Sequence, residues 1–223
     1  MPRQIPFALP VDPAMGEDDF LVTSSNQEAA RQVNEAEPSS LLLLLGPKGT
    51  GKSHLARIWK KRLDAATLDF DDMTVDALQD ARAFVWEDAD QLPWDAAHEE
   101  KAFHLLNTLR ERKAALLITA SLAPAQWELA LADLRSRLLA LPVAQIGTPD
   151  DALVAGLLLK HLNDRQLRVT EDVLNYLLPR LPREGARIEE AVRKLDRASL
   201  ADRRAITIPL AREILGDFLA VDS

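Results

Sequence analysis

Gly46-Pro47-Lys48-Gly49-Thr50-Gly51-Lys52-Ser53 directly follows the apolar run Leu41–Leu45. This stretch fits the pattern G-x-x-x-x-G-K-[ST] and stands between a buried strand and a helix that is expected to begin near Lys52. Glycines let the backbone turn tightly and direct several N–H groups inward, which makes an anion-binding nest at a helix N-terminus. The pattern therefore predicts a nucleotide site in which Lys52 reaches the β- and γ-phosphates and Ser53 binds Mg²⁺. A glycine-rich turn before an amphipathic helix is the structural alternative.

Composition limits the function classes that this chain of 223 residues can serve. A hydrophobic content of 47% supports a large core, whereas the net charge of −8 argues against broad binding to duplex DNA, which needs clustered Lys and Arg. Cysteine is absent, which excludes disulfides and thiol chemistry and indicates a cytoplasmic protein. No apolar run approaches the ~20 residues of a membrane span, and the N-terminus lacks the apolar region of a signal peptide.

Short apolar segments that alternate with helical patterns predict a parallel α/β sheet covered on both faces. Besides 41–45, strands are expected at 67–70, 83–86, 116–119 and 143–146. Helices are expected at 26–37, 52–63, 75–79 and 98–112, and in a region from Pro124 to Leu138.

From Pro149 onward the pattern is helical only, with helices expected at 150–163, 170–178, 185–201 and after Pro209. Thr148 and Thr170, each followed by acidic residues, are predicted to cap two of them. The predicted architecture is an α/β P-loop base with a five-stranded parallel sheet, plus a small all-helical C-terminal lid. The predicted domains are a tail at 1–20, the base at 21–148 and the lid at 149–223.

A P-loop base followed by a helical lid resembles the AAA+ ATPases. The sequences of residues 149–174 and of Gly51-Lys52-Ser53-His54-Leu55 resemble the corresponding segments of the initiator DnaA. Within that group the chain is most similar to the short Hda-type regulatory inactivators of DnaA, since it ends near the last lid helix without a DNA-binding domain. The resemblance implies that DnaA is a partner and that the P-loop holds ADP or ATP with Mg²⁺. It extends the nucleotide-binding set to Gly46, Pro47, Lys48, Gly49, Thr50, Gly51, Lys52, Ser53 and His54.

The tail contains Gln4-Ile5-Pro6-Phe7-Ala8-Leu9, which resembles the Q-x-x-apolar-x-L motif that docks into the DNA polymerase III β sliding clamp. In that role Gln4 donates or accepts a hydrogen bond, and Ile5, Phe7 and Leu9 supply the apolar contact. The protein would then meet DNA indirectly, through the clamp. An N-terminal arm that packs on its own domain is the alternative.

Glu87 and Asp88 follow the strand expected at 83–86, which is the Walker B position. There one carboxylate holds Mg²⁺ through water and the next orients the attacking water. DnaA-like proteins usually carry Asp first, so Glu87 predicts feeble intrinsic hydrolysis at most. An acidic edge between strand and loop is the structural alternative. The resemblance also places a polar sensor at Ser121, where the close relatives carry Asp and where Ser could equally cap a turn.

Two arginines complete the predicted site. Arg137, in Asp133-Leu134-Arg135-Ser136-Arg137, matches an arginine finger that acts in trans on the ATP of a neighbouring subunit. Arg187 matches the lid arginine that contacts phosphates in cis. Either residue could instead be a surface ion-pair partner.

Three functions follow from these features. The first is an Hda-like negative regulator that stimulates hydrolysis of DnaA-bound ATP while tethered to the clamp. The second is a self-assembling ATPase of the helicase-loader type, for which a homodimer or higher oligomer is expected. The third, a truncated initiator, is disfavoured by the acidic charge and by the short interval between Ser53 and Glu87.

Overall fold

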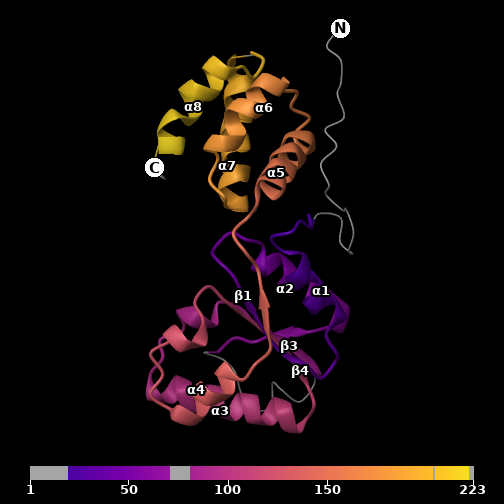
Figure 1. The fold of residues 1–223 in the computed structure, drawn as a ribbon, viewed down its shortest axis with the longest axis vertical. Coiled ribbons are helices and arrows are strands. Elements are labelled where there is room, and N and C mark those ends of the chain that lie inside the picture. Colours follow the sequence, from indigo (N-terminus) through magenta and orange to yellow (C-terminus); the bar gives the residue numbers. More distant parts are fainter. Residues whose placement is uncertain (1–19, 71–80, 203, 221–223) are drawn as a thin grey trace. The chain divides into compact units, whose positions relative to one another are not determined.

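The computed structural model describes residues 20–70, 81–202 and 204–220, which divide into two compact units (Figure 1). Residues 26–147 form the base, and residues 20–25 and 148–220 form the lid unit. The tail with Gln4, Ile5, Phe7 and Leu9, and the helix expected at 75–79, lie outside the described residues.

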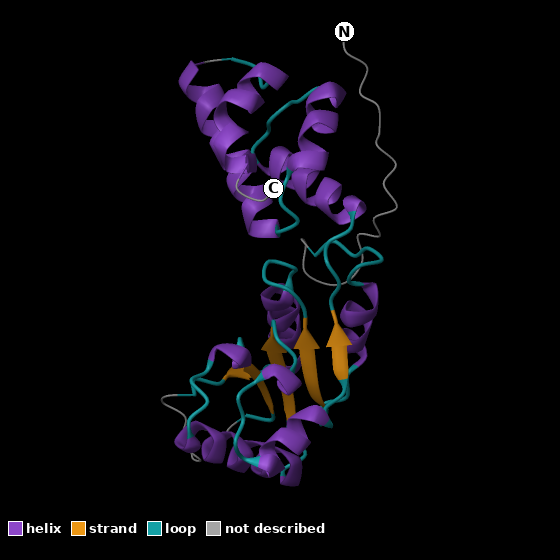
Figure 2. Cartoon of the chain, turned by 60° about the vertical axis from the view of Figure 1, so that its left-hand side comes forward, coloured by secondary structure: helices purple, strands orange, loops and turns teal. Residues whose placement is uncertain are grey.

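The base is built on five parallel strands, as the sequence predicted (Figure 2). Their order across the sheet is β2-β3-β4-β1-β5, so β1 lies between β4 and β5. Strands buried on both faces need mostly apolar residues, which Leu41–Leu45 and, apart from Thr119, the segment at 115–120 provide. The strands are β1 (Leu41–Leu45), β2 (Ala66–Thr67), β3 (Ala83–Trp86), β4 (Ala115–Ala120) and β5 (Val143–Gln145).

Four helices belong to the base: α1 (Gln27–Glu35), α2 (Lys52–Leu63), α3 (Ala96–Glu111) and α4 (Ala132–Leu139). The predicted apolar face of α3 is confirmed, because its four apolar side chains are buried in the core together with residues of the sheet: Ala102, Leu105, Leu106 and Leu109.

The helical region predicted from Pro124 to Leu138 is wrong in one respect, because it is not continuous. Pro124–Gln126 forms one short 3-10 turn, and α4 begins only at Ala132. Trp127 is extended, with ψ of 140°, and its indole N–H donates to the Leu122 carbonyl at 2.9 Å. The extended backbone and buried indole of Trp127 therefore interrupt the predicted helical region.

The lid unit contains α5 (Asp151–Asp164), α6 (Glu171–Leu177), α7 (Gly185–Asp202) and α8 (Ile208–Ala220). They enclose a separate apolar core that includes Leu158, Leu177, Val192 and Leu195. No helix in the described part of the chain is both long and apolar enough to cross a bilayer.

The predicted hydroxyl caps of the lid helices are wrong. Thr170 makes no side-chain hydrogen bond at the start of α6, and Asp150, not Thr148, caps α5 by accepting from the Leu153 N–H at 2.8 Å. The other Asp150 oxygen accepts from the Ser24 hydroxyl at 2.7 Å. Burial acts to raise the pKa of Asp150, but the hydrogen bonds from Ser24 and Leu153 outweigh it and leave that pKa below its ordinary value.

Candidate nucleotide-binding site

The predicted phosphate loop needs glycine at three positions for two different reasons. Gly49 and Gly51 have φ of 75° and 101°, in the left-handed region that L side chains rarely adopt. A Cβ on Gly46 would lie 2.9 Å from Ile146 Cβ, too close for real atoms. The loop therefore packs tightly on β5 and turns directly into α2.

The first turn of α2 is oriented toward this loop. Its first helical hydrogen bonds are accepted by the Gly51 carbonyl from the N–H groups of His54 and Leu55, so the N–H groups of Lys52 and Ser53 precede them. The positive end of the helix dipole acts at the same point. This combination is the physical basis of phosphate binding at a helix N-terminus.

Lys52 lies inside the loop with only 6% of its surface exposed. Its ammonium group donates to the Gly46 carbonyl at 2.8 Å, the Pro47 carbonyl at 3.1 Å and the Ser121 hydroxyl at 2.9 Å. Burial lowers the pKa of Lys52, and the carboxylates of Asp88 and Asp90 partly oppose that shift. Lys52 and Ser121, two of the predicted site residues, are thus in contact.

The strand order explains why residues far apart in sequence meet here. Gly46 follows β1, Ser121 follows β4 and Glu87 follows β3, and these three strands are adjacent and parallel. Their carboxyl ends therefore lie at one edge of the sheet, where ligands of open α/β sheets bind.

Glu87 and Asp88 are both exposed at this edge. Asp88 has φ of 50°, uncommon for a residue with a side chain, and its N–H donates to the buried Thr119 hydroxyl at 2.9 Å. This hydrogen bond fixes the backbone at the predicted Walker B position against β4.

Asp90, which the sequence reasoning missed, holds the sensor segment. One of its oxygens accepts from the N–H groups of Ser121 and Leu122, each at 3.1 Å. Its other oxygen is buried and makes no hydrogen bond within the described residues. No sequence signal distinguished Asp90 from other acidic residues, because its hydrogen-bond partners lie more than 30 positions away in the chain.

The arrangement fits a nucleotide better than a metal ion alone. Within residues 20–70, 81–202 and 204–220 no group of three or more His, Cys, Asp or Glu side chains could hold a metal. Mg²⁺ is commonly held by one or two protein ligands together with phosphates and water. Ser53, exposed at the start of α2, and Glu87 could supply those ligands beside a bound phosphate chain.

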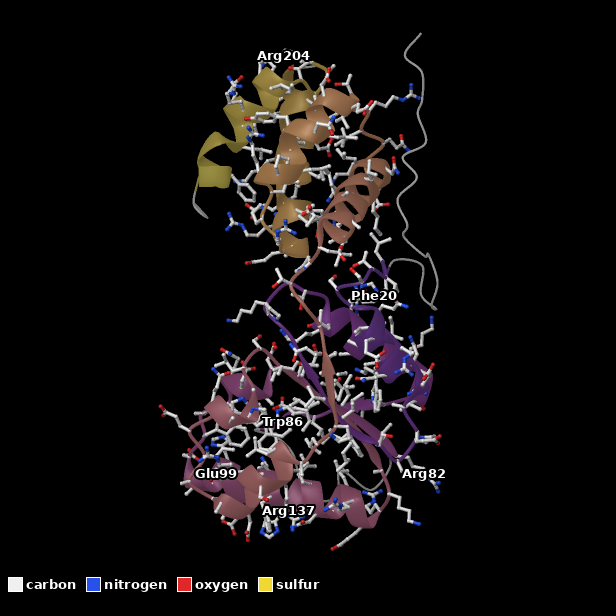
Figure 3. All side chains as sticks on the ribbon, in the orientation of Figure 1. Phe20, Arg82, Trp86, Glu99, Arg137 and Arg204 are labelled. Atoms are coloured by element: carbon white, nitrogen blue, oxygen red, sulfur yellow. The ribbon has the colours of Figure 1, made fainter. Side chains whose placement is uncertain are left out.

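Arg137 lies near the amino ends of the strands, on the side of the base away from the P-loop, and at the lower end of the base in Figure 3. It lines a cleft of about 930 Å³ that we term the arginine groove. The groove begins where β1, β4 and β5 begin, since Ser40, Lys113 and Pro142 line it. Its lining residues are Ser39, Ser40, Leu41, Leu106, Arg110, Lys113, Asp133, Ser136, Arg137, Ala140, Leu141 and Pro142.

Two contacts with α3 hold Arg137 and its helix in place. The guanidinium carbon of Arg137 lies 4.8 Å from the centre of the Phe103 ring, a cation–π contact. Glu99, only 3% exposed, accepts hydrogen bonds from the backbone N–H groups of Ala130 and Leu131 at the start of α4 (Figure 3). A carboxylate at that point also interacts favourably with the positive end of the α4 dipole.

Comparison with known proteins agrees with this architecture. The family described as "Hda, lid domain" matches residues 151–215. Domain III of the replication initiation protein DnaA from Thermotoga maritima has the same fold, with a TM-score of 0.77 and 20% identity over 90% of this chain and 95% of that one. The lid is thus similar to that of the Hda family, and the chain as a whole has the fold of DnaA domain III.

Two further proteins are similar to this chain over most of its length. AMPPCP-bound DnaA from Aquifex aeolicus matches with a TM-score of 0.65 and 19% identity over 82% of this chain and 68% of that one. An uncharacterized protein of Haemophilus influenzae is 25% identical over 212 residues, 90% of each chain.

The second predicted arginine lies in the lid. The Arg187 guanidinium, on α7, is 4.7 Å from the centre of the Phe218 ring and donates to the Phe218 carbonyl at 3.2 Å. These contacts hold Arg187 against α8. Its contact with phosphates in cis stays a prediction.

Proposed function

We propose that this DnaA- and Hda-like AAA+ protein is a negative regulator of replication initiation that stimulates hydrolysis of DnaA-bound ATP. In this proposal Arg137 enters the active site of DnaA beside the γ-phosphate, where its fixed charge stabilises the transition state. Such an arginine accelerates hydrolysis by about 10³–10⁵ in the nucleotide hydrolases where it has been measured. The proposed role is cytoplasmic.

The observation that supports action in trans is the separation of Arg137 from the chain's own P-loop. Ser40 and Gly46 stand at the two ends of β1, six residue steps apart, and each step along a strand spans ~3.3 Å, so the two are roughly 20 Å apart. Arg137 lies at the Ser40 end of β1 and Lys52 at the Gly46 end. An arginine side chain is too short to cross this distance, so Arg137 can serve only a nucleotide held by another subunit.

The chain's own P-loop is proposed to bind ADP or ATP with Mg²⁺. Lys52 would exchange its contacts with the Gly46 and Pro47 carbonyls for phosphate oxygens, and Ser53 and Glu87 would contact the ion. Glu87, with its longer side chain, would hold the ion less well than the Asp that is usual in DnaA-like proteins. We therefore expect intrinsic hydrolysis to be weak, and the bound nucleotide to stabilise the base instead.

The tail residues Gln4, Ile5, Phe7 and Leu9 are proposed to dock on the β sliding clamp loaded on DNA. Tethering raises the effective concentration of Arg137 near any DnaA molecule on the same DNA without a new contact between the two proteins. It would also confine the activity to times when clamps are on the DNA.

The experiment follows conversion of DnaA-bound ATP to ADP with DNA-loaded clamp, with and without this protein. Arg137→Ala should abolish the stimulation. Arg135→Ala should keep it, because Arg135 is exposed on the same helix and does not line the arginine groove. Equal stimulation by wild type and Arg137→Ala would refute the assignment, and no stimulation by wild type would refute the proposed function.

One observation favours the alternative, a self-assembling ATPase of the helicase-loader type. Both the P-loop and the arginine groove are present in one chain, so one copy could serve the next. In that case the protein alone would hydrolyse ATP at a rate per molecule that rises with its own concentration, and DnaA would have no effect.

A further inference from the structure

We infer that Arg110 and Lys113 bind the phosphate groups of the nucleotide held by the neighbouring subunit, in the same groove as Arg137. The inference rests on the proposed function of Arg137 and adds two residues to the site. It assigns them binding of the partner's nucleotide, and it leaves the acceleration of hydrolysis to Arg137.

The charge of the arginine groove is the first observation. Three cations line it, Arg110, Lys113 and Arg137, and one carboxylate, Asp133. Within the described part of the chain none of the three cationic side chains forms an ion pair or a hydrogen bond. A chain with a net charge of −8 thus concentrates positive charge in one cleft. Such a cleft raises the local concentration of anions.

The origin of these cations is the second observation. Arg110 lies in the last turn of α3, and Lys113 follows its end with φ of 51°, so both benefit from the negative end of the α3 dipole. That effect explains why cations occur there, but it acts equally on Arg112, which does not line the groove. It also does not explain why Arg137, from α4, faces the same cleft.

The other polar lining favours phosphate as the anion. Ser39, Ser40 and Ser136 add hydroxyl donors to the three cations. Phosphate has three or more acceptor oxygens and is bound by guanidinium, ammonium and hydroxyl groups together. The guanidinium of Arg110 can bind two of these oxygens at once, whereas the ammonium of Lys113 acts as a point charge. A nucleotide polyphosphate is the phosphate ligand that Arg137 would meet in trans.

The test measures DnaA–ATP hydrolysis on DNA-loaded clamp as a function of the concentration of this protein. Arg110→Gln combined with Lys113→Gln should raise the concentration for half-maximal stimulation about tenfold or more, with an unchanged maximal rate. Arg137→Ala should instead lower the maximal rate, because it removes an interaction made in the transition state. Arg135→Gln combined with Arg168→Gln is the matched control, since both residues are exposed and neither lines the groove.

A second measurement identifies what the two cations contact. Binding of the full chain to DnaA is compared for the ATP-loaded and ADP-loaded forms in the absence of DNA. The nucleotide-free form of DnaA is measured beside them. If Arg110 and Lys113 contact the phosphate chain, the double variant should lose affinity for the nucleotide-loaded forms and not for the nucleotide-free form. An equal loss of affinity for all three forms would mean contact with an acidic protein surface and would overturn the inference.

The outcomes separate the two proposals. If wild type stimulates hydrolysis, Arg137→Ala does not, and the double variant behaves as its control, the inference fails while the proposed function stands. If wild type itself gives no stimulation, the proposed function fails. Urea midpoints of the variants, read from tryptophan emission, exclude unfolding as the cause of a loss.

Discussion

Replacement of Glu99 tests whether one buried carboxylate positions the arginine helix. Glu99→Ala removes the acceptor for the N–H groups of Ala130 and Leu131, and leaves both at the start of α4 without it. We expect the base to lose stability and α4 to shift. Stimulation of DnaA-bound ATP hydrolysis should fall with it, although Glu99 itself does not line the arginine groove.

The magnitude follows from the two hydrogen bonds. A hydrogen bond to a charged group contributes about 1.5–3 kcal/mol, so two amount to about 3–6 kcal/mol. Removal of the carboxylate also removes the cost of burying it, which offsets part of that sum. The expected loss is about 2–4 kcal/mol for Glu99→Ala, and about half of it for Glu99→Gln, whose single amide oxygen replaces two carboxylate oxygens.

Urea unfolding followed by tryptophan emission measures this loss in the base alone. All four tryptophans, at positions 59, 86, 94 and 127, belong to the base. With a slope of about 2 kcal/mol per molar urea, a loss of 3 kcal/mol lowers the midpoint by roughly 1.5 M. Glu100→Ala is the control, because Glu100 is exposed on the same helix and should cost at most about 0.5 kcal/mol. Equal midpoints for the two variants would refute the role of Glu99.

Three further changes test the site and the lid. Gly51→Ala forces a side chain into a φ of 101°, costs about 1–2 kcal/mol and should weaken binding of a fluorescent ADP analogue at least tenfold, whereas intact binding would contradict the assigned geometry. Asp90→Ala should lower the urea midpoint of the base, and Asp90→Asn should not, since an amide oxygen can still accept from Ser121 and Leu122; equal effects would exclude the assigned hydrogen bonds. Asp150→Ala should cost about 1–2 kcal/mol of α5 protection in hydrogen exchange at neutral pH. Because the pKa of Asp150 is lowered in the folded state, its contribution is present above the unfolded value of about 3.9 and is lost as the pH falls through the folded value, so the variant should lack this acid-dependent loss.

The parts of the fold that the sequence predicted are those that local patterns determine. The bounds of β1 and α2 agree with prediction because the phosphate-loop motif marks the end of one and the start of the other. The Trp127 anchor could not be predicted, because its hydrogen bond to Leu122 competes with helix formation. Asp150 replaced the expected Thr148 cap for a similar reason, since its carboxylate also binds Ser24, 126 positions away in the chain.

The residues of the candidate site likewise fall into those that the sequence predicted and those that it did not. Contact between Lys52 and Ser121 follows from the motif and the strand order, because β1 and β4 are neighbours. Asp90, Glu99 and Phe103 carry no motif, and each acts through a partner more than 30 positions away. Sequence patterns therefore predict the residues that would meet a ligand, and miss those that hold them in position.

The two edges of the sheet determine which assemblies this protein can form. An association that brings the arginine groove to a P-loop is head-to-tail, because the two features lie at opposite ends of β1. A symmetric pair that joined groove to groove would oppose two sets of cations, Arg110, Lys113 and Arg137, and would be disfavoured by their repulsion. In the proposed complex a bound polyphosphate neutralises the groove, so the preferred neighbour is one that carries a nucleotide in its P-loop. On this proposal the charge of the groove selects the nucleotide-loaded state of the partner, and Arg137 acts on the nucleotide of the partner so selected.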